Sequence, residues 1–273
     1  MKLTLAEQML YTTVKVSAYK GSQPVGTGTA FFWLIQDGPK HAIMLATNKH
    51  VIAGCDRLEV ICHLASSATG EAPSGRFATV SVQLDPAGII NHPDPEVDLC
   101  ALGFSELIDN ALSAGRPLFL RTIDRSVVPT PDQWAAFDAI EDVLMVGCPR
   151  GIYDEANNHP IVRRGITATS LGKDYNHKAE FMVDMACFPG SSGSPVFLHQ
   201  IGYVDRSTGN YMLDARRFFF LGVLYQGPLI TNEGLIKFGN TPRVEVAAMM
   251  HLGQVIRSSK MLEVEDLVRA HLG

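Results

Sequence analysis

Long hydrophobic runs, blocks of like charge and paired cysteines are all missing from this sequence. The densest apolar stretch, residues 217–225, is far shorter than the roughly 18 to 20 residues that a membrane-spanning helix needs. Lys and Arg total 23 while Asp and Glu total 28, so the net charge is −5, and no basic cluster is present. We therefore expect neither a nucleic-acid partner nor a membrane partner.

The cysteines and the N-terminus bear on the compartment. Five cysteines are an odd number, and none forms a Cys-x-x-Cys pair, which favours reduced thiols. The N-terminal residues meet Glu7 before any long apolar core, unlike a secretory signal. We expect a cytoplasmic protein. The nine histidines lack metal-ligand spacing, so we expect no metal site.

Short runs rich in Val, Ile, Thr and Phe, closed by turn-forming residues, predict two groups of β-strands. The expected strands are residues 11–19, 28–35, 42–47, 58–63, 78–84 and 99–103, then 142–148, 161–171, 180–185, 195–198, 211–213 and 218–224. Such groups suggest antiparallel barrels or sandwiches. Apolar residues at helical intervals predict helices at residues 104–114, 244–258 and 261–272.

The segment with the most chemical information is residues 187–197, Cys-Phe-Pro-Gly-Ser-Ser-Gly-Ser-Pro-Val-Phe. A serine is a poor nucleophile unless a base removes its proton and N–H donors stabilise the developing oxyanion. Gly190 allows a turn in which its own N–H and that of Ser192 converge, and Gly193 leaves room for a substrate backbone. Ser192 is then the nucleophile. The alternative is a plain surface turn.

A base and an orienting carboxylate are available earlier in the chain. His50 follows an apolar strand in Thr-Asn-Lys-His-Val-Ile, and Asp98 directly precedes the strand Leu-Cys-Ala-Leu. His50 can accept the serine proton, and Asp98 can fix its tautomer. Taken singly, His50 could be a core or turn histidine and Asp98 a cap at the start of a strand.

Together these segments, in the order His50, Asp98, Ser192, resemble the three catalytic blocks of trypsin-like (chymotrypsin-fold) serine peptidases. They are closest in style to bacterial HtrA-like peptidases and glutamyl endopeptidases. Residues 26–31, Gly-Thr-Gly-Thr-Ala-Phe, are also similar to a strand of that group. The resemblance covers residues 14–227.

The resemblance implies an all-β fold of two antiparallel β-barrels with the active site between them. The N-terminal barrel (1–121) would carry His50 and Asp98. A connection (122–135) would lead to the C-terminal barrel (136–243) with Ser192, followed by C-terminal helices (244–273) without a PDZ domain. Gly190 and Ser192 would form the oxyanion hole. The resemblance implies no metal or organic cofactor.

The resemblance also implies a pocket for the residue before the scissile bond, with Ala186 at its floor and Leu224 in its wall. Neither side chain is charged, so we expect cleavage after a small or medium apolar residue. Gly227 would leave the entrance open and Tyr225 would narrow the site. Secreted digestive members have an aspartate before the nucleophile, which pairs with an N-terminus released by cleavage. Ser191 stands there instead.

Two hypotheses remain. The first is a serine endopeptidase that makes limited cuts in a specific cytosolic protein, with a regulatory protein partner left open. The second is a catalytically silent peptide-binding or scaffold module of the same fold, which recognises an extended segment by strand addition.

Overall fold

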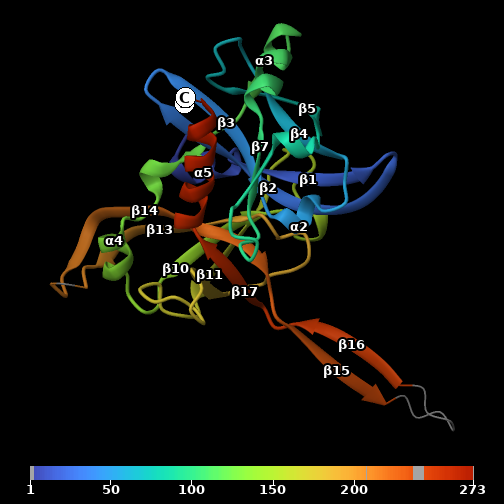
Figure 1. Cartoon of the computed structure of the whole chain (residues 1–273). Coiled ribbons are helices and arrows are strands. Elements are labelled where there is room, and N and C mark those ends of the chain that lie inside the picture. Colours follow the sequence, from blue (N-terminus) through green and yellow to red (C-terminus); the bar gives the residue numbers. More distant parts are fainter. Residues whose placement is uncertain (1–2, 207, 236–242, 273) are drawn as a thin grey trace.

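The computed structural model describes residues 3–206, 208–235 and 243–272, and β-strands make up most of its secondary structure (Figure 1). Nine strands form the first sheet, in the order β5-β4-β1-β2-β3-β7-β6, with β8 beside β4 and β9 beside β2. They are β1 (Thr13–Lys20), β2 (Gln23–Asp37), β3 (Lys40–Thr47), β4 (Arg57–Ala65), β5 (Pro73–Gln83), β6 (Ile89–Asn91), β7 (Cys100–Gly103), β8 (Leu118–Phe119) and β9 (Ile123–Asp124).

Six strands form the second unit, a closed barrel in the order β10-β11-β12-β17-β14-β13. They are β10 (Asp142–Gly147), β11 (Ile161–Thr167), β12 (Glu180–Asp184), β13 (Pro195–Val204), β14 (Tyr211–Gln226) and β17 (Leu252–Arg257). The two strands expected at residues 211–213 and 218–224 are one continuous strand, β14. The all-β architecture of two units is confirmed.

The helix predicted over residues 244–258 is wrong. This segment forms β16 (Arg243–Met249), which pairs with β15 (Leu229–Leu235) in a hairpin that projects from the body, and then β17 (Figure 1). β17 pairs with both β12 and β14, so the barrel satisfies its backbone groups. Barrel pairing outweighs the helical spacing, since β-branched Val255 and Ile256 fit a buried strand well.

Within the residues that the structure describes, five helices lie around these units: α1 (Leu5–Leu10), α2 (Lys49–Ile52), α3 (Ser105–Ser113), α4 (Pro131–Ala136) and α5 (Ser259–Leu272). Short 3-10 turns are η1 (Pro86–Gly88), η2 (Arg125–Val127) and η3 (Pro149–Gly151). α5 confirms the predicted final helix, and its Val264 packs in one core with Trp33 of the first sheet and Phe220 of the second barrel. In the part of the chain described, no helix combines the length and apolar character needed to cross a bilayer.

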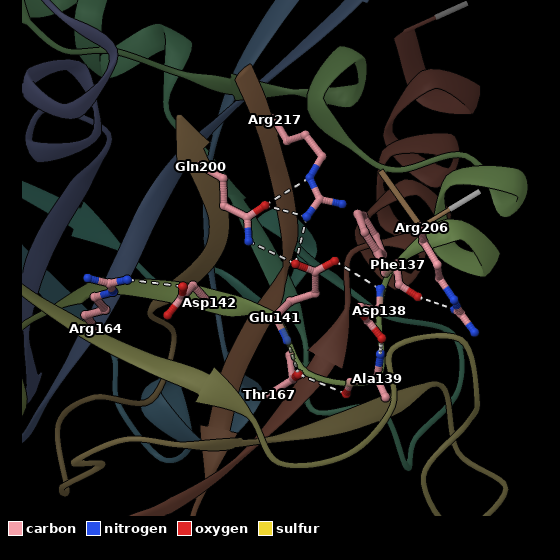
Figure 2. Close-up of polar contacts among 10 residues, drawn as sticks. All are labelled: Phe137, Asp138, Ala139, Glu141, Asp142, Arg164, Thr167, Gln200, Arg206 and Arg217. Carbon is pink, nitrogen blue, oxygen red and sulfur yellow. Dashed lines mark hydrogen bonds and ion pairs between the residues drawn. The ribbon is translucent and has the colours of Figure 1, made fainter. Parts of the chain in front are cut away.

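The connection between the units is attached to the second barrel by a buried carboxylate, Glu141 (Figure 2). Its side chain accepts from Arg217 Nη2 at 2.8 Å, from Gln200 Nε2 at 2.9 Å and from the backbone N–H of Asp138 at 3.0 Å. The backbone N–H of Glu141 donates to Thr167 Oγ1 at 2.9 Å. A buried charge is costly unless it is paired. The bonds from Gln200 of β13 and Arg217 of β14 supply this pairing, and they hold the start of β10 against these two strands.

Candidate active site

His50 is the second residue of α2, which begins directly after β3. Its ring Nδ1 bonds Asp98 Oδ2, and its backbone N–H donates to Asp98 Oδ1 at 3.0 Å. Because a carboxylate only accepts, Nδ1 carries the proton and Nε2 is left as the acceptor. The His50 side chain is 49% exposed.

Asp98 lies just before β7, and its loop is tied to α2 from several sides. Its backbone carbonyl accepts from Asn48 Nδ2 at 2.6 Å. The Lys49 ammonium donates to the carbonyls of His92 and Asp94 at 3.1 and 3.0 Å. The carboxylate of Asp98 is therefore held at a fixed position relative to His50.

The segment before Ser192 forms a tight turn. The N–H of Ser191 donates to the carbonyl of Phe188 at 2.9 Å, with Pro189 second and Gly190 third in the turn. Gly190 has φ +86°, which is typical of the third residue of a type II turn. A Cβ there would lie 2.8 Å from the backbone N of Arg150, so only glycine fits.

The carbonyls of this turn all have partners, whereas two of its N–H groups have none among the residues that the structure describes. The carbonyls of Pro189, Gly190, Ser191 and Ser192 accept, in that order, from Arg150 N, Thr29 Oγ1, Ser194 N and Thr29 N. Within the described residues, the N–H groups of Gly190 and Ser192 donate to no acceptor of the chain. They are the two donors expected for an oxyanion.

The hydroxyl of Ser192 donates to the carbonyl of Tyr225 at 3.1 Å. In the described part of the chain, no hydrogen bond joins Ser192 to His50. Burial raises the pKa of the Tyr225 hydroxyl, and the charges of Glu180 and Asp98 raise it further. The Tyr225 hydroxyl donates to Glu180 Oε2 at 3.0 Å.

A cavity of about 200 Å³ adjoins Ser192. Its lining consists of Cys187, Phe188, Pro189, Ser192, Leu224, Tyr225, Gln226 and Gly227. Three of the four residues expected there, Leu224, Tyr225 and Gly227, lie in this lining. Ala186 does not. Its carbonyl accepts from Arg163 Nη1 at 2.6 Å, and the next residue, Cys187, lines the cavity instead.

The Cys187 side chain, in the lining of the cavity, is buried. Burial raises the pKa of its thiol to about 11, so it is neutral at pH 7.

Gly193 is required for a different reason from the one expected. It has φ +88°, and a Cβ there would lie 1.9 Å from the carbonyl oxygen of Thr29 and 2.6 Å from Thr47 Oγ1. The first sheet, rather than a substrate backbone, occupies this space. Gly193 thus allows the serine turn to pack directly on β2.

Sequence reasoning missed three contributors to this site. Thr29 bonds the serine turn, Arg163 braces the carbonyl of Ala186, and Gly253 of β17 lies behind the cavity wall. Only Thr29 had a signal, because it follows the Gly-Thr-Gly of residues 26–28. The other two depend on tertiary structure: Gly253 on the closure of the barrel by β17, and Arg163 on which face of β11 points inward.

A sequence profile described as trypsin-like peptidase domain matches residues 28–204, and no curated protein matches significantly. Solved structures with a similar course of the chain include a thermostable serine protease from an extremophilic microorganism, with 11% identity, a TM-score of 0.48 and coverage of 94% of this chain and 97% of that one. A serine endoprotease from Yersinia pestis has 16% identity and a TM-score of 0.49, covering 98% and 68%. A protease of M. tuberculosis in its active form has 14% identity and a TM-score of 0.45, covering 93% and 79%.

Proposed function

Because the chain belongs to the trypsin-like peptidase family, and is therefore a serine endopeptidase, we propose that Ser192, His50 and Asp98 form its catalytic triad. The observation that carries this proposal is the pair of unused N–H donors, of Gly190 and Ser192, at the turn that presents the Ser192 hydroxyl. The bond between His50 Nδ1 and Asp98 supports it, since it leaves Nε2 as a base.

The reaction follows from these groups. The Ser192 hydroxyl rotates about Cα–Cβ from the Tyr225 carbonyl to His50 Nε2, which takes its proton as Oγ attacks the substrate carbonyl. The N–H groups of Gly190 and Ser192 stabilise the oxyanion of the tetrahedral intermediate. Protonated His50 then donates to the leaving amine, which gives an acyl-enzyme. Water activated by His50 releases the acid and restores Ser192.

The substrate preference is proposed from the cavity beside Ser192. Its lining contains no charged side chain, and Phe188 and Leu224 make it apolar. A volume of about 200 Å³ suits a small or medium apolar residue before the scissile bond. The backbone of residues 225–227 would pair with the substrate as an added strand. Limited cleavage of a specific cytosolic protein is the proposed role.

A second function is favoured by one observation, the bond from Ser192 Oγ to the Tyr225 carbonyl rather than to His50. If that bond persisted, the chain would bind an extended peptide without cleaving it.

Peptide-library cleavage separates the two functions. The protein and its Ser192→Ala variant are incubated with a proteome-derived peptide library, and new termini are identified by mass spectrometry. The proposal predicts new cuts after small or medium apolar residues with the wild type only. Absence of cuts with both proteins, or equal cuts with both, would contradict it.

A further inference from the structure

Thr29 joins the two β-units at the serine turn. It lies on β2, and its side chain is fully buried. Its hydroxyl donates to the carbonyl of Gly190 at 2.9 Å and accepts from the backbone N–H of Cys148 at 3.0 Å. Its backbone N–H donates to the carbonyl of Ser192 at 2.9 Å. One residue therefore holds two carbonyls of the turn.

The Gly190 carbonyl belongs to the Gly190–Ser191 peptide, which lies between the peptide that carries the Gly190 N–H and the peptide that carries the Ser192 N–H. A peptide group is planar and trans, so fixing a carbonyl also fixes the N–H on its opposite side. The Thr29 hydroxyl holds the middle peptide by its Gly190 carbonyl, and the N–H of Ser194 holds the Ser191 carbonyl, opposite the Ser192 N–H, at 3.0 Å. The N–H of Arg150 holds the Pro189 carbonyl, opposite the Gly190 N–H, at 2.6 Å. The N–H of Gly190 consequently points away from Arg150.

Thr29 is itself held in place. Its carbonyl accepts from Thr47 Oγ1 at 2.7 Å, and Thr47 ends β3, directly before α2 and His50. The side chain of Ser191, in contrast, gives the turn no support. It is fully buried, and its hydroxyl has no hydrogen-bond partner in the described residues. The only side-chain donor to the turn's carbonyls in that part of the chain is the Thr29 hydroxyl.

We propose that Thr29 is a positioning residue, whose hydroxyl holds the Gly190–Ser191 peptide between the two donor peptides, so that the N–H groups of Gly190 and Ser192 converge on one oxyanion. This inference rests on the proposed function. Without the hydroxyl, the Gly190 carbonyl would lose its partner, and the turn could rotate to conformations in which the two donors diverge. The loss would affect the oxyanion stage and leave substrate binding unchanged, since Thr29 does not line the cavity.

The test compares phosphonylation of Ser192 by a fluorophosphonate in the wild type, Thr29→Val and Thr29→Ser. Valine keeps the shape of threonine without the hydroxyl, and serine keeps the hydroxyl. Loss of one oxyanion donor costs about 10²–10³ in rate, so loosening both should slow inactivation about tenfold to a hundredfold in Thr29→Val. The inhibitor constant KI should stay within about twofold, and Thr29→Ser should recover most of the wild-type rate. Thr13→Val, which removes another buried hydroxyl, is the matched control and should react normally.

The outcomes are distinct. A labelled wild type with Thr29→Val reacting at the same rate would overturn the positioning role and leave the proposed function standing. A wild type that is not labelled would overturn the proposed function, and the positioning role with it. If Thr29→Val does not fold, Thr29→Cys replaces it, because a thiol is a weak donor of similar size. The same slowing supports the proposal, and the wild-type rate overturns it.

Discussion

The carboxylate of Asp98 bonds His50 twice, with one oxygen on the ring Nδ1–H and the other on the backbone N–H at 3.0 Å. This arrangement fixes both the tautomer of the ring and the position of α2. It connects the Asp98 loop of the first sheet to the chemistry proposed for Ser192. A substitution at Asp98 can change the bond to the His50 ring while it keeps the bond to the His50 backbone N–H.

Asp98→Asn should abolish most of the activity with little change in fold. An amide can still accept from the backbone N–H of His50, but its NH₂ group would force the wrong tautomer. We expect a fall of about 10³–10⁴ in the rate of Ser192 phosphonylation. This rate is measured by quenching the reaction with a fluorophosphonate at a series of times and quantifying the labelled protein. A rate within tenfold of wild type would show that Asp98 does not orient the base.

Gly190→Ala should remove the oxyanion site. A Cβ would meet the backbone N of Arg150 at 2.8 Å, and φ +86° is unfavourable for alanine. The turn must shift, and we expect at least about a hundredfold loss of labelling rate. Gly172→Ala is the control, because its Cβ would meet its nearest neighbour at an ordinary 3.7 Å. Equal rates for both variants would contradict the assignment of this turn.

Gly253→Ala should shift cleavage toward smaller residues. A Cβ at Gly253 would lie 2.6 Å from both Cys187 Sγ and Leu224 Cδ1, and both side chains line the cavity. Displacing them inward narrows the space. Peptide-library profiling should show a smaller preferred residue before the cut than for wild type. Gly103→Ala, with no atom within 4 Å of its Cβ, should keep the wild-type profile.

Stability should fall as the pH drops from about 6.5 to about 4. Burial lowers the pKa of His63 to about 4, and its Nε2–H donates to the Asn158 carbonyl at 3.0 Å. Between these pH values the unfolded chain binds a proton that the folded chain does not, so the free energy of unfolding rises with pH there. His159, at 5.4 Å from His63 between ring centroids, also has a lowered pKa because of burial.

The matched variant for this pH effect is His63→Gln, which keeps a donor for Asn158 without titrating. Its free energy of unfolding, measured by urea denaturation, should change less over the same pH range. If the free energies of unfolding of the wild type and His63→Gln changed equally with pH, the lowered pKa of His63 would be contradicted.

Glu265→Ala should destabilise the fold by about 3 kcal/mol or more, because it breaks a buried ion pair. The Glu265 side chain is fully buried on α5, accepts from Trp33 Nε1 at 2.9 Å and pairs with Arg269 at 2.7 Å. Urea denaturation measures the loss. Asp266→Ala, exposed on the same helix, should change stability by less than about 0.5 kcal/mol. A similar loss in both variants would contradict the role of Glu265.

Local sequence patterns predicted most strands of both units, because alternating apolar residues and turn residues act over short distances, but they missed the short strands β6, β8 and β9. They failed at β16 and β17, where helical spacing competed with the pairing of β16 to β15 and of β17 to β12 and β14. The pairing of β17 depends on partners 28 to 76 residues away in the chain, which local periodicity does not include.

The candidate site divides in the same way. His50, Asp98 and Ser192 stand in recognisable segments, and the bond between His50 and Asp98 was expected. The bond between Thr29 and Gly190, 161 residues apart, was not, because nothing local indicates where a hydroxyl on β2 will point. The sequence predicted Ala186 at the floor of the cavity, but the next residue, Cys187, lines it. Which residue of this loop faces the cavity depends on tertiary contacts, such as the bond from Arg163 to the Ala186 carbonyl.

The most direct test of the account is the site of fluorophosphonate labelling, determined by peptide mass spectrometry on the wild type and Ser192→Ala. The account predicts one adduct, on Ser192, which disappears in the variant. Labelling of another residue, or no adduct on the folded wild type, would contradict an activated serine at this turn.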